Sequence, residues 1–489
     1  MRPFVDRSDG FLYEQIATVI SKMVANETLE PGDQLPSVRE ISRSRDVSIS
    51  TAVKAYRLLE DRGLVEARPK SGFYVRTVNR RRIAEPAMTQ PPPYSRDVEC
   101  HDLVQRLLST LSDPDVIRLG AALPDAAYLP IEALGRQLAR VARLPGHQDP
   151  AYDPYGEANL RRAFAHRGIL SGCSFDADDI LVTNGCIEAL SLSRQAVTEP
   201  GDVVAVESPT YCGVLHLLEQ LGRRVWELPT SSKTGACLEG IEEALAEDVD
   251  ALLLTPSFNN PIGSLMPAAH REDVYDLLCR HDVPLIEDDI YGDLYFGGAR
   301  PRPIKALDRE GRVLYCTSTS KTIAPGYRIG FVSAGRYTEA IAALKMAHTA
   351  STSVPVQRAM AAYLEQPGYE KRLRSVRRVY ENNLHRMREG IAETFPSGTC
   401  VSAPQGGFLL WVEMPSGTDA MQLSNAAMRR GISVAPGPLF SCCLSYDHCL
   451  RLNGGVPWSS DVEAAIETLG ELAHRAMRRA TPEAVSACC

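Results

Sequence analysis

The sequence predicts an α/β protein in which a large domain of alternating strands and helices follows a small N-terminal domain. From residue 116 onward, helical patterns separate short apolar runs rich in β-branched residues, among them "DILVT", "DVVAVE", "ALLLTP", "VPLIED" and "VLYCTS". Such runs are typical of parallel strands that helices cover on both faces. The 489 residues are also too many for one hydrophobic core, because single cores stop growing beyond roughly 250–300 residues.

Charge separates the two ends of the chain. Residues 1–82 hold 15 Lys and Arg against 11 Asp and Glu, a net charge of +4, whereas the remaining residues hold 38 against 50, a net charge of −12. A small basic domain joined to an acidic one is expected to bind a polyanion. The first ten residues lack the layout of a signal peptide, and no run of about 18 apolar residues could span a bilayer. We therefore expect a cytoplasmic protein without a membrane segment.

The 13 cysteines show neither CxxC pairs nor the Cys/His spacing of a metal site. We expect no metal site, and we interpret most cysteines as small buried apolar residues in a reducing compartment. The doublets Cys442-Cys443 and Cys488-Cys489 offer no spacing from which a role can be predicted.

The first 76 residues predict three helices and a hairpin. "FLYEQIATVISKMVAN" has apolar residues at helical spacing, and in "LEPGDQLPSVREIS" Ser37 precedes Glu40 by three residues, which is the pattern of a capping box. "VSISTAVKAYRLLEDRG" predicts a third helix that ends at Gly63, and "LVEARPKSGFYVR" predicts two strands around a turn. This order is that of a winged helix-turn-helix, whose third helix enters the major groove of DNA.

Residues 11–76 resemble the GntR family of bacterial transcription regulators through "LYEQIA", "LEPGDQLPSVREI" and "KAYRLLEDRGLVEARPKSGFYV". The alternative is a small α/β domain whose charges only interact with solvent. Relatives often carry Arg where Ile49 stands, which removes one expected polar contact. The resemblance implies contacts to double-stranded DNA from Arg39, Ser48, Thr51, Lys70 and Gly72.

Residues 77–115 change character. The run "NRRR" is followed by "EPAMTQPPPYSRD", which has three consecutive prolines and no apolar period. We predict a semi-rigid linker between a DNA-binding domain at 1–76 and the large domain at 116–489.

Polar residues follow the predicted strands of the large domain, and ligands of parallel sheets bind at such strand ends. Lys321 lies among hydroxyl residues, and a desolvated lysine amine can attack a carbonyl cofactor. Pyridoxal phosphate needs a phosphate cradle, a carboxylate at the ring nitrogen, donors to the phenolic oxygen and an aromatic ring to stack on. Candidates for the cradle are Ser318, Ser320, Arg328 and the helix start at Gly185 and Cys186; the other candidates are Asp288, Tyr291 and Asn260.

This layout resembles the fold-type I pyridoxal-phosphate enzymes of the class I/II aminotransferase family over residues 116 to about 475. Such a fold has a large subdomain, here expected at about 150–335, and a small one at about 340–480 together with 116–149. The resemblance implies that Lys321 attaches the cofactor covalently, that Asp288 lies at the ring nitrogen and that Tyr291 contacts the phenolic oxygen.

The same resemblance assigns further residues. It implies that Asn260 also contacts the phenolic oxygen, that Tyr211 stacks on the ring and that Arg451 binds the α-carboxylate of a substrate. Tyr152 matches a tyrosine that reaches the phosphate of a partner subunit, which implies a homodimer. Cys186 and Ala122 stand where relatives often carry Ser and Gly, so a phosphate contact is lost and the substrate pocket is narrowed.

The whole chain resembles the MocR subfamily of GntR regulators, which join the two domain types. The resemblance implies a transcription regulator whose aminotransferase-like domain binds pyridoxal phosphate and senses the cofactor or an amino compound. One alternative is an active aminotransferase that acts on an amino acid and a 2-oxo acid, with the DNA-binding domain as an accessory. Another is a metabolic enzyme that has lost DNA binding. Since Lys321, Asp288 and Tyr291 suit catalysis as well as sensing, we expect some residual transaminase activity.

Overall fold

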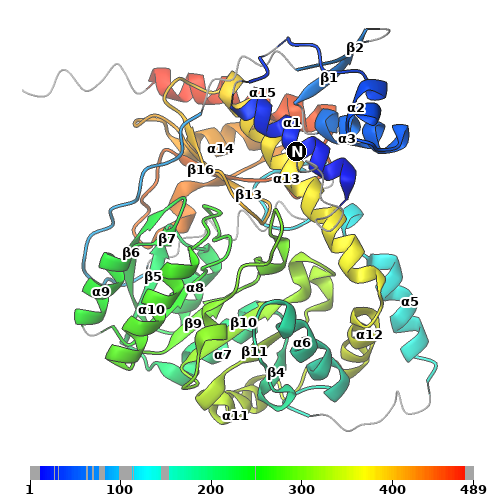
Figure 1. The fold of residues 1–489 in the computed structure, drawn as a ribbon. Helices are drawn as coiled ribbons and strands as arrows, with labels where there is room; N and C mark the ends of the chain where they lie inside the picture. Colours follow the sequence, from blue (N-terminus) through cyan, green and yellow to red (C-terminus); the bar gives the residue numbers. More distant parts are fainter. Residues whose placement is uncertain are drawn as a thin grey trace, which may run out of the picture. The chain divides into compact units, whose positions relative to one another are not determined.

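The chain forms two compact units, the head (Met1–Arg82) and the body (Ile83–Cys489). The computed structural model describes residues 11–26, 28–30, 32–61, 64–68, 71–75, 83–98, 113, 115–144, 153–247 and 249–479. Figure 1 shows the ribbon, with the body as a layered α/β arrangement.

The head has the predicted three helices and hairpin: α1 (Leu12–Ala25), α2 (Val38–Ser44), α3 (Ile49–Asp61), β1 (Val65–Arg68) and β2 (Gly72–Val75). The two strands pair antiparallel, with Val65 opposite Val75. The predicted capping box starts α2, because Ser37 N donates to Glu40 Oε2 at 2.7 Å and Glu40 N donates to Ser37 Oγ at 3.2 Å. Tyr56 on α3 stacks on Phe73 of β2 at 4.7 Å, which ties the hairpin to the helices.

The body is built on an eight-stranded sheet in the order β4-β11-β10-β9-β8-β5-β6-β7. Its strands are β4 (Ile180–Thr183), β5 (Val203–Ser208), β6 (Arg224–Ser231), β7 (Gly235–Ala236), β8 (Ala251–Leu254), β9 (Leu285–Asp288), β10 (Val313–Ser318) and β11 (Gly330–Ser333). The neighbours from β10 through β9, β8 and β5 to β6 are all parallel, whereas β11 and β7 run antiparallel to their neighbours. The mainly parallel sheet confirms the predicted fold class.

Helices cover both faces of this sheet, and the side chains of each strand alternate between them. Val204 and Val206 pack in one core with α7 (Cys186–Val197) and α8 (Cys212–Gln220). Ala205 between them packs in the opposite core with α9 (Leu238–Ala246) and α10 (Ala268–His281). Two buried faces explain why these strands are largely apolar. The remaining large-sheet helices are α5 (Ile131–Val141), α6 (Ala158–Leu170), α11 (Thr338–His348) and α12 (Val354–Leu364).

A smaller antiparallel sheet, in the order β12-β13-β16-β15, completes the body. Its strands are β12 (Cys400–Val401), β13 (Leu409–Glu413), β15 (Ala435–Pro436) and β16 (Cys449–Asn453). The helices of this part of the chain are α13 (Gly368–Thr394), α14 (Ala420–Met428) and α15 (Ser460–Arg479). Close to this sheet, β3 (Ile117–Arg118) pairs in parallel with β14 (Ile432–Ser433). This pairing holds the chain that continues to Gly120 and Ala122 beside the small sheet.

Residues 83–98 of the predicted linker segment lie on the body. Val401 N donates to Ala84 O at 2.8 Å, and Thr89 Oγ1 donates to Ser208 O at 2.6 Å. Arg96 and Val225 exchange two backbone hydrogen bonds, at 2.9 and 2.8 Å, so this segment extends the edge of β6 by one bridge.

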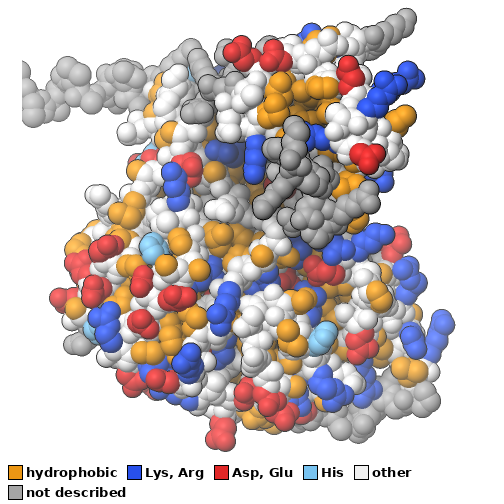
Figure 2. Space-filling model, viewed as in Figure 1, with side chains coloured by type: hydrophobic (Ala, Val, Ile, Leu, Met, Phe, Trp, Pro, Cys, Tyr) orange, Lys and Arg blue, Asp and Glu red, His pale blue; other side chains and the backbone are white. Residues whose placement is uncertain are grey.

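The surface of the body mixes charges of both signs. Figure 2 shows acidic and basic side chains interspersed over the face that is turned to the viewer. Such a face has no single-sign field to attract a polyanion. Among the described residues, no helix combines the length and the apolar character that crossing a membrane requires.

The capping box generates a prediction about the head. Ser37→Ala should lower the stability of the first turn of α2 by about 1 kcal/mol, because Glu40 N loses its acceptor. Hydrogen–deuterium exchange of the Glu40 amide should then be about fivefold faster. Ser44→Ala is the control, because Ser44 Oγ donates to Ile41 O at the other end of the helix. Equal Glu40 exchange in the Ser37→Ala and unsubstituted chains would contradict the role of the box.

Candidate functional site

The predicted cofactor residues gather at the carboxyl ends of the large-sheet strands. Asp288 ends β9 and Ser318 ends β10. Gly185 and Cys186 lie within three residues of the end of β4, Tyr211 of β5, Tyr291 of β9, and Ser320 and Lys321 of β10, whereas Asn260 lies six residues after β8. Because these strand ends share one edge of a parallel sheet, their side chains meet in one pocket. Arg328 follows the short helix η7 (Pro325–Tyr327), and Arg451 reaches the same pocket from β16 of the small sheet.

Lys321 ends the short helix η6 (Thr319–Lys321), and its Nζ donates to Ala122 O at 2.6 Å. The ammonium lies 5.6 Å from the centre of the Tyr291 ring. Burial, together with the positive charge of Arg451, lowers the pKa of Lys321 to about 8, although Asp288 opposes the shift. With this pKa about a tenth of the amine is neutral at pH 7, and the neutral amine is the form that attacks a carbonyl carbon.

Asp288 is the last residue of β9 and is buried. Its Oδ1 accepts the Cys186 thiol at 3.4 Å and Ile290 N at 3.1 Å. Burial raises the pKa of Asp288 to about 6, and the two hydrogen bonds limit the rise. A carboxyl poised this way can hold a proton together with a basic ring nitrogen.

A cradle for an anion is formed where α7 begins. Gly185 precedes the helix with φ of 85°, and a Cβ there would lie 2.5 Å from the Arg328 guanidinium. Only glycine therefore fits both the backbone and the space. Arg328 Nη2 donates to Asn184 O at 3.0 Å, which places its charge beside the free N–H groups of the helix start. Backbone N–H groups, a helix dipole and an arginine together suit a phosphate.

Two buried hydroxyls in this pocket have no hydrogen-bond partner: Ser320 Oγ and Tyr291 Oη. Leaving a buried hydroxyl unpaired costs about 1–3 kcal/mol, so a polar ligand is expected to form hydrogen bonds with these two hydroxyls. Ser318 Oγ accepts Ser320 N at 3.3 Å, which directs the Ser320 side chain. A phosphate fits Ser320, and a phenolic oxygen fits Tyr291, so these residues suit pyridoxal phosphate.

Tyr211 provides the aromatic surface. It precedes α8, and its ring atoms lie 2.5–2.9 Å from where a Cβ on Gly213 would stand. The ring therefore folds against a position that must be glycine. Burial raises the pKa of both Tyr211 and Tyr291 above the ordinary value, so both phenols keep their proton.

Arg451 is the buried cation of the pocket, with a side chain 1% exposed. Its Nη1 donates to Asn260 Oδ1 at 2.9 Å, and its Nη2 donates to Gly120 O. The guanidinium carbon lies 4.9 Å from the centre of the Phe440 ring. Burial lowers the pKa of Arg451. Among the described residues no carboxylate pairs with its guanidinium, so a ligand carboxylate can neutralise this charge.

Sequence patterns did not predict several contacts. The carbonyls of Gly120 and Ala122 accept from Arg451 and Lys321, yet carbonyls leave no pattern in a sequence. The sequence placed Cys186 at the phosphate through its backbone, whereas its thiol contacts Asp288, 102 positions away. Tyr152 and Lys70 lie outside the described residues.

Four of the five predicted DNA-contacting residues, Arg39, Ser48, Thr51 and Gly72, lie in the described part of the head and are at least partly exposed. Arg39 is exposed on α2. Ser48 Oγ accepts Thr51 N at 3.1 Å and lies 2.8 Å from Thr51 Oγ1, so the two hydroxyls form one polar group at the start of α3. Ile49 beside them is 56% exposed. Gly72 starts β2 with φ of 112°, which glycine adopts most readily.

Fold and site together define a winged helix-turn-helix joined to a pyridoxal-phosphate-binding body. Residues 115–469 match the family of class I and II aminotransferases, and residues 12–75 match the gntR family of bacterial regulatory proteins. The chain therefore belongs to the class I and II aminotransferase family and carries a GntR head, the combination of the MocR subfamily.

Two relatives from Escherichia coli K12 share both units. The uncharacterized HTH-type transcriptional regulator YjiR is 37% identical over 95% of this chain and 99% of its own. The uncharacterized HTH-type transcriptional regulator YdcR is 37% identical over 94% of this chain and 98% of its own.

Among solved structures, the body resembles the α-aminoadipate aminotransferase LysN of Thermus thermophilus, complexed with N-(5'-phosphopyridoxyl)-L-leucine. The two share 28% identity and a TM-score of 0.70 over 78% of this chain and 95% of the other. A kynurenine aminotransferase of Pyrococcus horikoshii shares 28% identity and a TM-score of 0.71 with the body, over 77% of this chain and 95% of the other. The cofactor of this fold is pyridoxal phosphate.

The pKa of Lys321 generates a prediction about cofactor uptake. The rate at which the cofactor-free chain incorporates pyridoxal phosphate should rise with pH around a midpoint near 8, because only the neutral amine reacts. Arg451→Gln should raise this midpoint, and Asp288→Asn should lower it, because the two charges act on Lys321 with opposite sign. The visible absorbance of the bound cofactor measures the rate.

Lys321→Ala is the control, since it removes the amine. A chain with this change that retains the visible band contradicts the assignment of Lys321. A midpoint that stays unchanged in Arg451→Gln contradicts the electrostatic coupling.

Proposed function

We propose that the protein is a pyridoxal-phosphate-dependent transcription regulator, which binds operator DNA through the head and an amino compound at the cofactor site of the body. The observation that carries the proposal is that Lys321 lies close to a buried Arg451, which forms no ion pair with the described residues, in a chain that also has the helices and hairpin of a winged helix-turn-helix. Since operator DNA and free amino acids are both found in the cytoplasm, we place its action there.

The body recognises its ligand at two points. Arg451 binds a carboxylate of the ligand. The negative charge of the carboxylate pairs with the positive guanidinium, and the two carboxylate oxygens accept from its N–H groups. When bound, pyridoxal phosphate supplies a carbonyl carbon open to amines and a ring that withdraws electrons. Lys321 would hold the cofactor through its amine, and the amine of a ligand would compete with Lys321 for the same carbon. A compound that carries both an amine and a carboxylate engages both residues, so an amino acid is the expected class of effector.

The remaining residues hold the cofactor in place. Asp288 would share a proton with the ring nitrogen, and Tyr291 would donate to the phenolic oxygen together with Asn260, which accepts from Arg451. The Gly185 cradle, Ser320 and Arg328 would hold the phosphate, and Tyr211 would cover the ring and exclude water.

Regulation requires that the ligand distinguish two states of the protein. The release of the Lys321 amine and the pairing of Arg451 both change the charges in a buried pocket. Interactions between charges are strongest in such a pocket, because water does not screen them. We propose that the regulator acts as a homodimer, in which Tyr152 contacts the partner's phosphate and two heads bind two half-sites.

Turnover as an aminotransferase is the second candidate function. The observation that favours it is the lowered pKa of Lys321, which suits a general base near neutral pH. Lys321 would then act as a general base that accepts and returns a proton of the substrate. Sensing needs only the release of the Lys321 amine, so the two functions separate experimentally.

The DNA contacts generate a prediction. Arg39→Ala should weaken binding to the DNA upstream of the protein's own gene by about tenfold, because an arginine contact to DNA is worth about 1–3 kcal/mol. Lys22→Ala is the matched control, since it removes one exposed positive charge from α1 outside the helix-turn-helix pair. Mobility-shift titrations at fixed salt measure both. Equal affinity of the Arg39→Ala and unsubstituted chains would rule out this contact.

The choice between sensor and enzyme generates another prediction. A panel of amino acids should change the cofactor spectrum of the chain, while turnover with 2-oxoglutarate stays below about 1 per second, the lower end for enzymes. Arg451→Gln should lose the response to amino acids and keep the response to amines without a carboxylate. Rapid spectroscopy and detection of the new amino acid measure the two steps. Turnover in the range of ordinary enzymes would favour the second function.

A further inference from the structure

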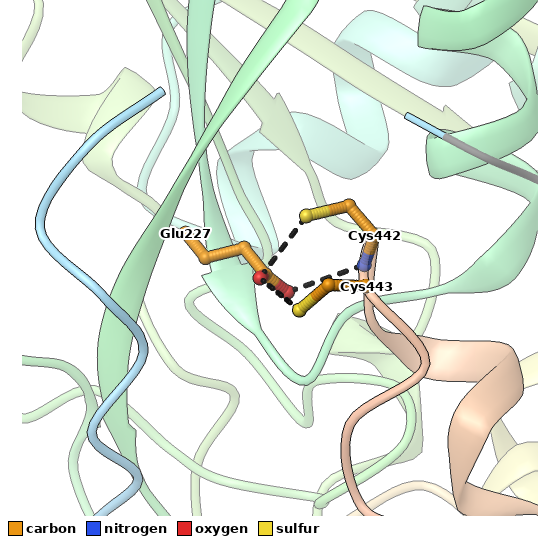
Figure 3. A group of neighbouring side chains, drawn as sticks. All are labelled: Glu227, Cys442 and Cys443. Atoms are coloured by element: carbon orange, nitrogen blue, oxygen red, sulfur yellow. Dashed lines mark hydrogen bonds between the residues drawn. The ribbon is translucent and has the colours of Figure 1, made fainter. Parts of the chain in front are cut away.

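Two consecutive cysteines meet a buried carboxylate of the large sheet. Cys442 and Cys443 follow the short helix η9 (Gly437–Phe440), and Glu227 lies in the middle of β6. Figure 3 shows both sulfur atoms and the carboxylate turned toward one another. In an extended strand, neighbouring side chains point to opposite sides, so the turn after η9 is what brings both thiols to the same carboxylate.

The distances in this cluster are those of ligands around one metal ion. Cys442 Sγ lies 3.1 Å from Glu227 Oε2, and Cys443 Sγ lies 3.7 Å from the same oxygen. One ligand atom from each residue can be chosen so that all lie within 4.8 Å of one another. Tetrahedral zinc with Zn–S bonds of about 2.3 Å and Zn–O bonds of about 2.0 Å separates its S and O ligands by roughly 3.5 Å. The three side chains therefore need only small rotations to bind one ion.

Glu227 is a buried carboxyl group whose hydrogen-bond donors are all neutral. The residue is 3% exposed. Ser208 Oγ donates at 2.9 Å, Cys442 N donates at 3.4 Å, and the two thiols complete the set. Within the described ranges no ion pair reaches this carboxylate. A buried carboxylate without a paired cation is costly, so the arrangement favours a bound positive ion.

Arg96 lies close enough to Cys442 for its positive charge to act on the thiol. The Nη2 atom of Arg96 is buried and has no hydrogen-bond partner. A zinc ion with two thiolates and one carboxylate has a net charge of about −1, which the Arg96 charge balances.

A disulfide between the two cysteines does not explain the cluster. The Cα atoms of consecutive residues are about 3.8 Å apart across a trans peptide. Ordinary disulfides join Cα atoms about 4.4–6.8 Å apart. A carboxylate also plays no part in a disulfide, whereas it is a regular ligand of zinc.

We propose that Glu227, Cys442 and Cys443 form a binding site for a thiophilic divalent cation of the zinc class, with water at the fourth tetrahedral position. Cys443 is exposed, so the ion enters from solvent and water reaches the open position. Binding forms two metal–sulfur bonds and one metal–oxygen bond, breaks the two S–H bonds and releases both protons to solvent. The site is independent of the proposed regulatory function.

Zinc binding to the full chain tests the proposal. Cys488→Ser and Cys489→Ser are introduced first, because this second doublet could bind metal on its own. After treatment with a chelator, this reference chain should take up about one zinc ion per chain, with the geometry of three protein ligands. Mass spectrometry of the metal content measures the stoichiometry, and competition with a chromogenic chelator measures the affinity.

Two substitutions and one control locate the ion. Cys443→Ser and Glu227→Gln in the reference chain should each weaken zinc binding by at least about tenfold. Cys237→Ser is the matched control, since the Cys237 thiol also donates to a carboxylate, Glu239 Oε2, at 2.7 Å but has no second thiol there. It should leave affinity and stoichiometry unchanged.

The outcomes decide between a site and a neutral hydrogen-bonded cluster. Cobalt in the reference chain should give the charge-transfer absorption of thiolate ligands, and Cys443→Ser should reduce it. A reference chain that binds no zinc, or a Cys443→Ser chain that binds it as tightly, overturns the proposal. Since Cys443 is exposed, Cys443→Ser should leave the fold intact, and thermal unfolding of the metal-free chains checks this. The Cys443→Ser chain therefore tests the site even if Glu227→Gln unfolds the protein.

Discussion

One buried guanidinium joins the two sheets of the body. Arg451 extends from the small sheet and donates to Asn260, which follows a strand of the large sheet, and to the carbonyl of Gly120. A buried charge is tolerated only where its hydrogen bonds are made, so these contacts fix how the small sheet meets the strand ends. Gly120 is part of this constraint, because a Cβ there would lie 2.7 Å from the backbone of Val434.

The same burial sets the proton chemistry of the pocket. Desolvation is the first cause of both the lowered pKa of Lys321 and the raised pKa of Asp288. The two groups move toward each other on the pH scale, to about 8 and about 6, and each limits the shift of the other through its charge. A pocket open to water would return both toward their ordinary values, so the protein controls reactivity by controlling solvent access.

The sequence predicted what local pattern determines. The run "VLYCTS" coincides with β10, and the Ser37–Glu40 spacing coincides with the capping box. The residues near the carboxyl ends of the strands could be predicted as site residues, because these strand ends lie at one edge of a parallel sheet. Contacts between distant positions leave no such pattern: the thiol of Cys186 meets Asp288 across 102 positions, and Cys442 meets Glu227 across 215. The bridge of Arg96 to Val225 is a single pair, too short to produce a periodicity.

The segment from Gly437 to Tyr446 borders two pockets at once. Its Phe440 ring lies against Arg451, and the Phe440 carbonyl accepts Thr210 N at 2.9 Å, next to Tyr211. At its other end Tyr446 Oη lies 2.8 Å from Ser208 Oγ, which also donates to Glu227. Thermodynamic linkage is reciprocal. Whatever factor an ion at the cysteine pair imposes on the affinity of an amino acid, the amino acid imposes on the affinity of the ion.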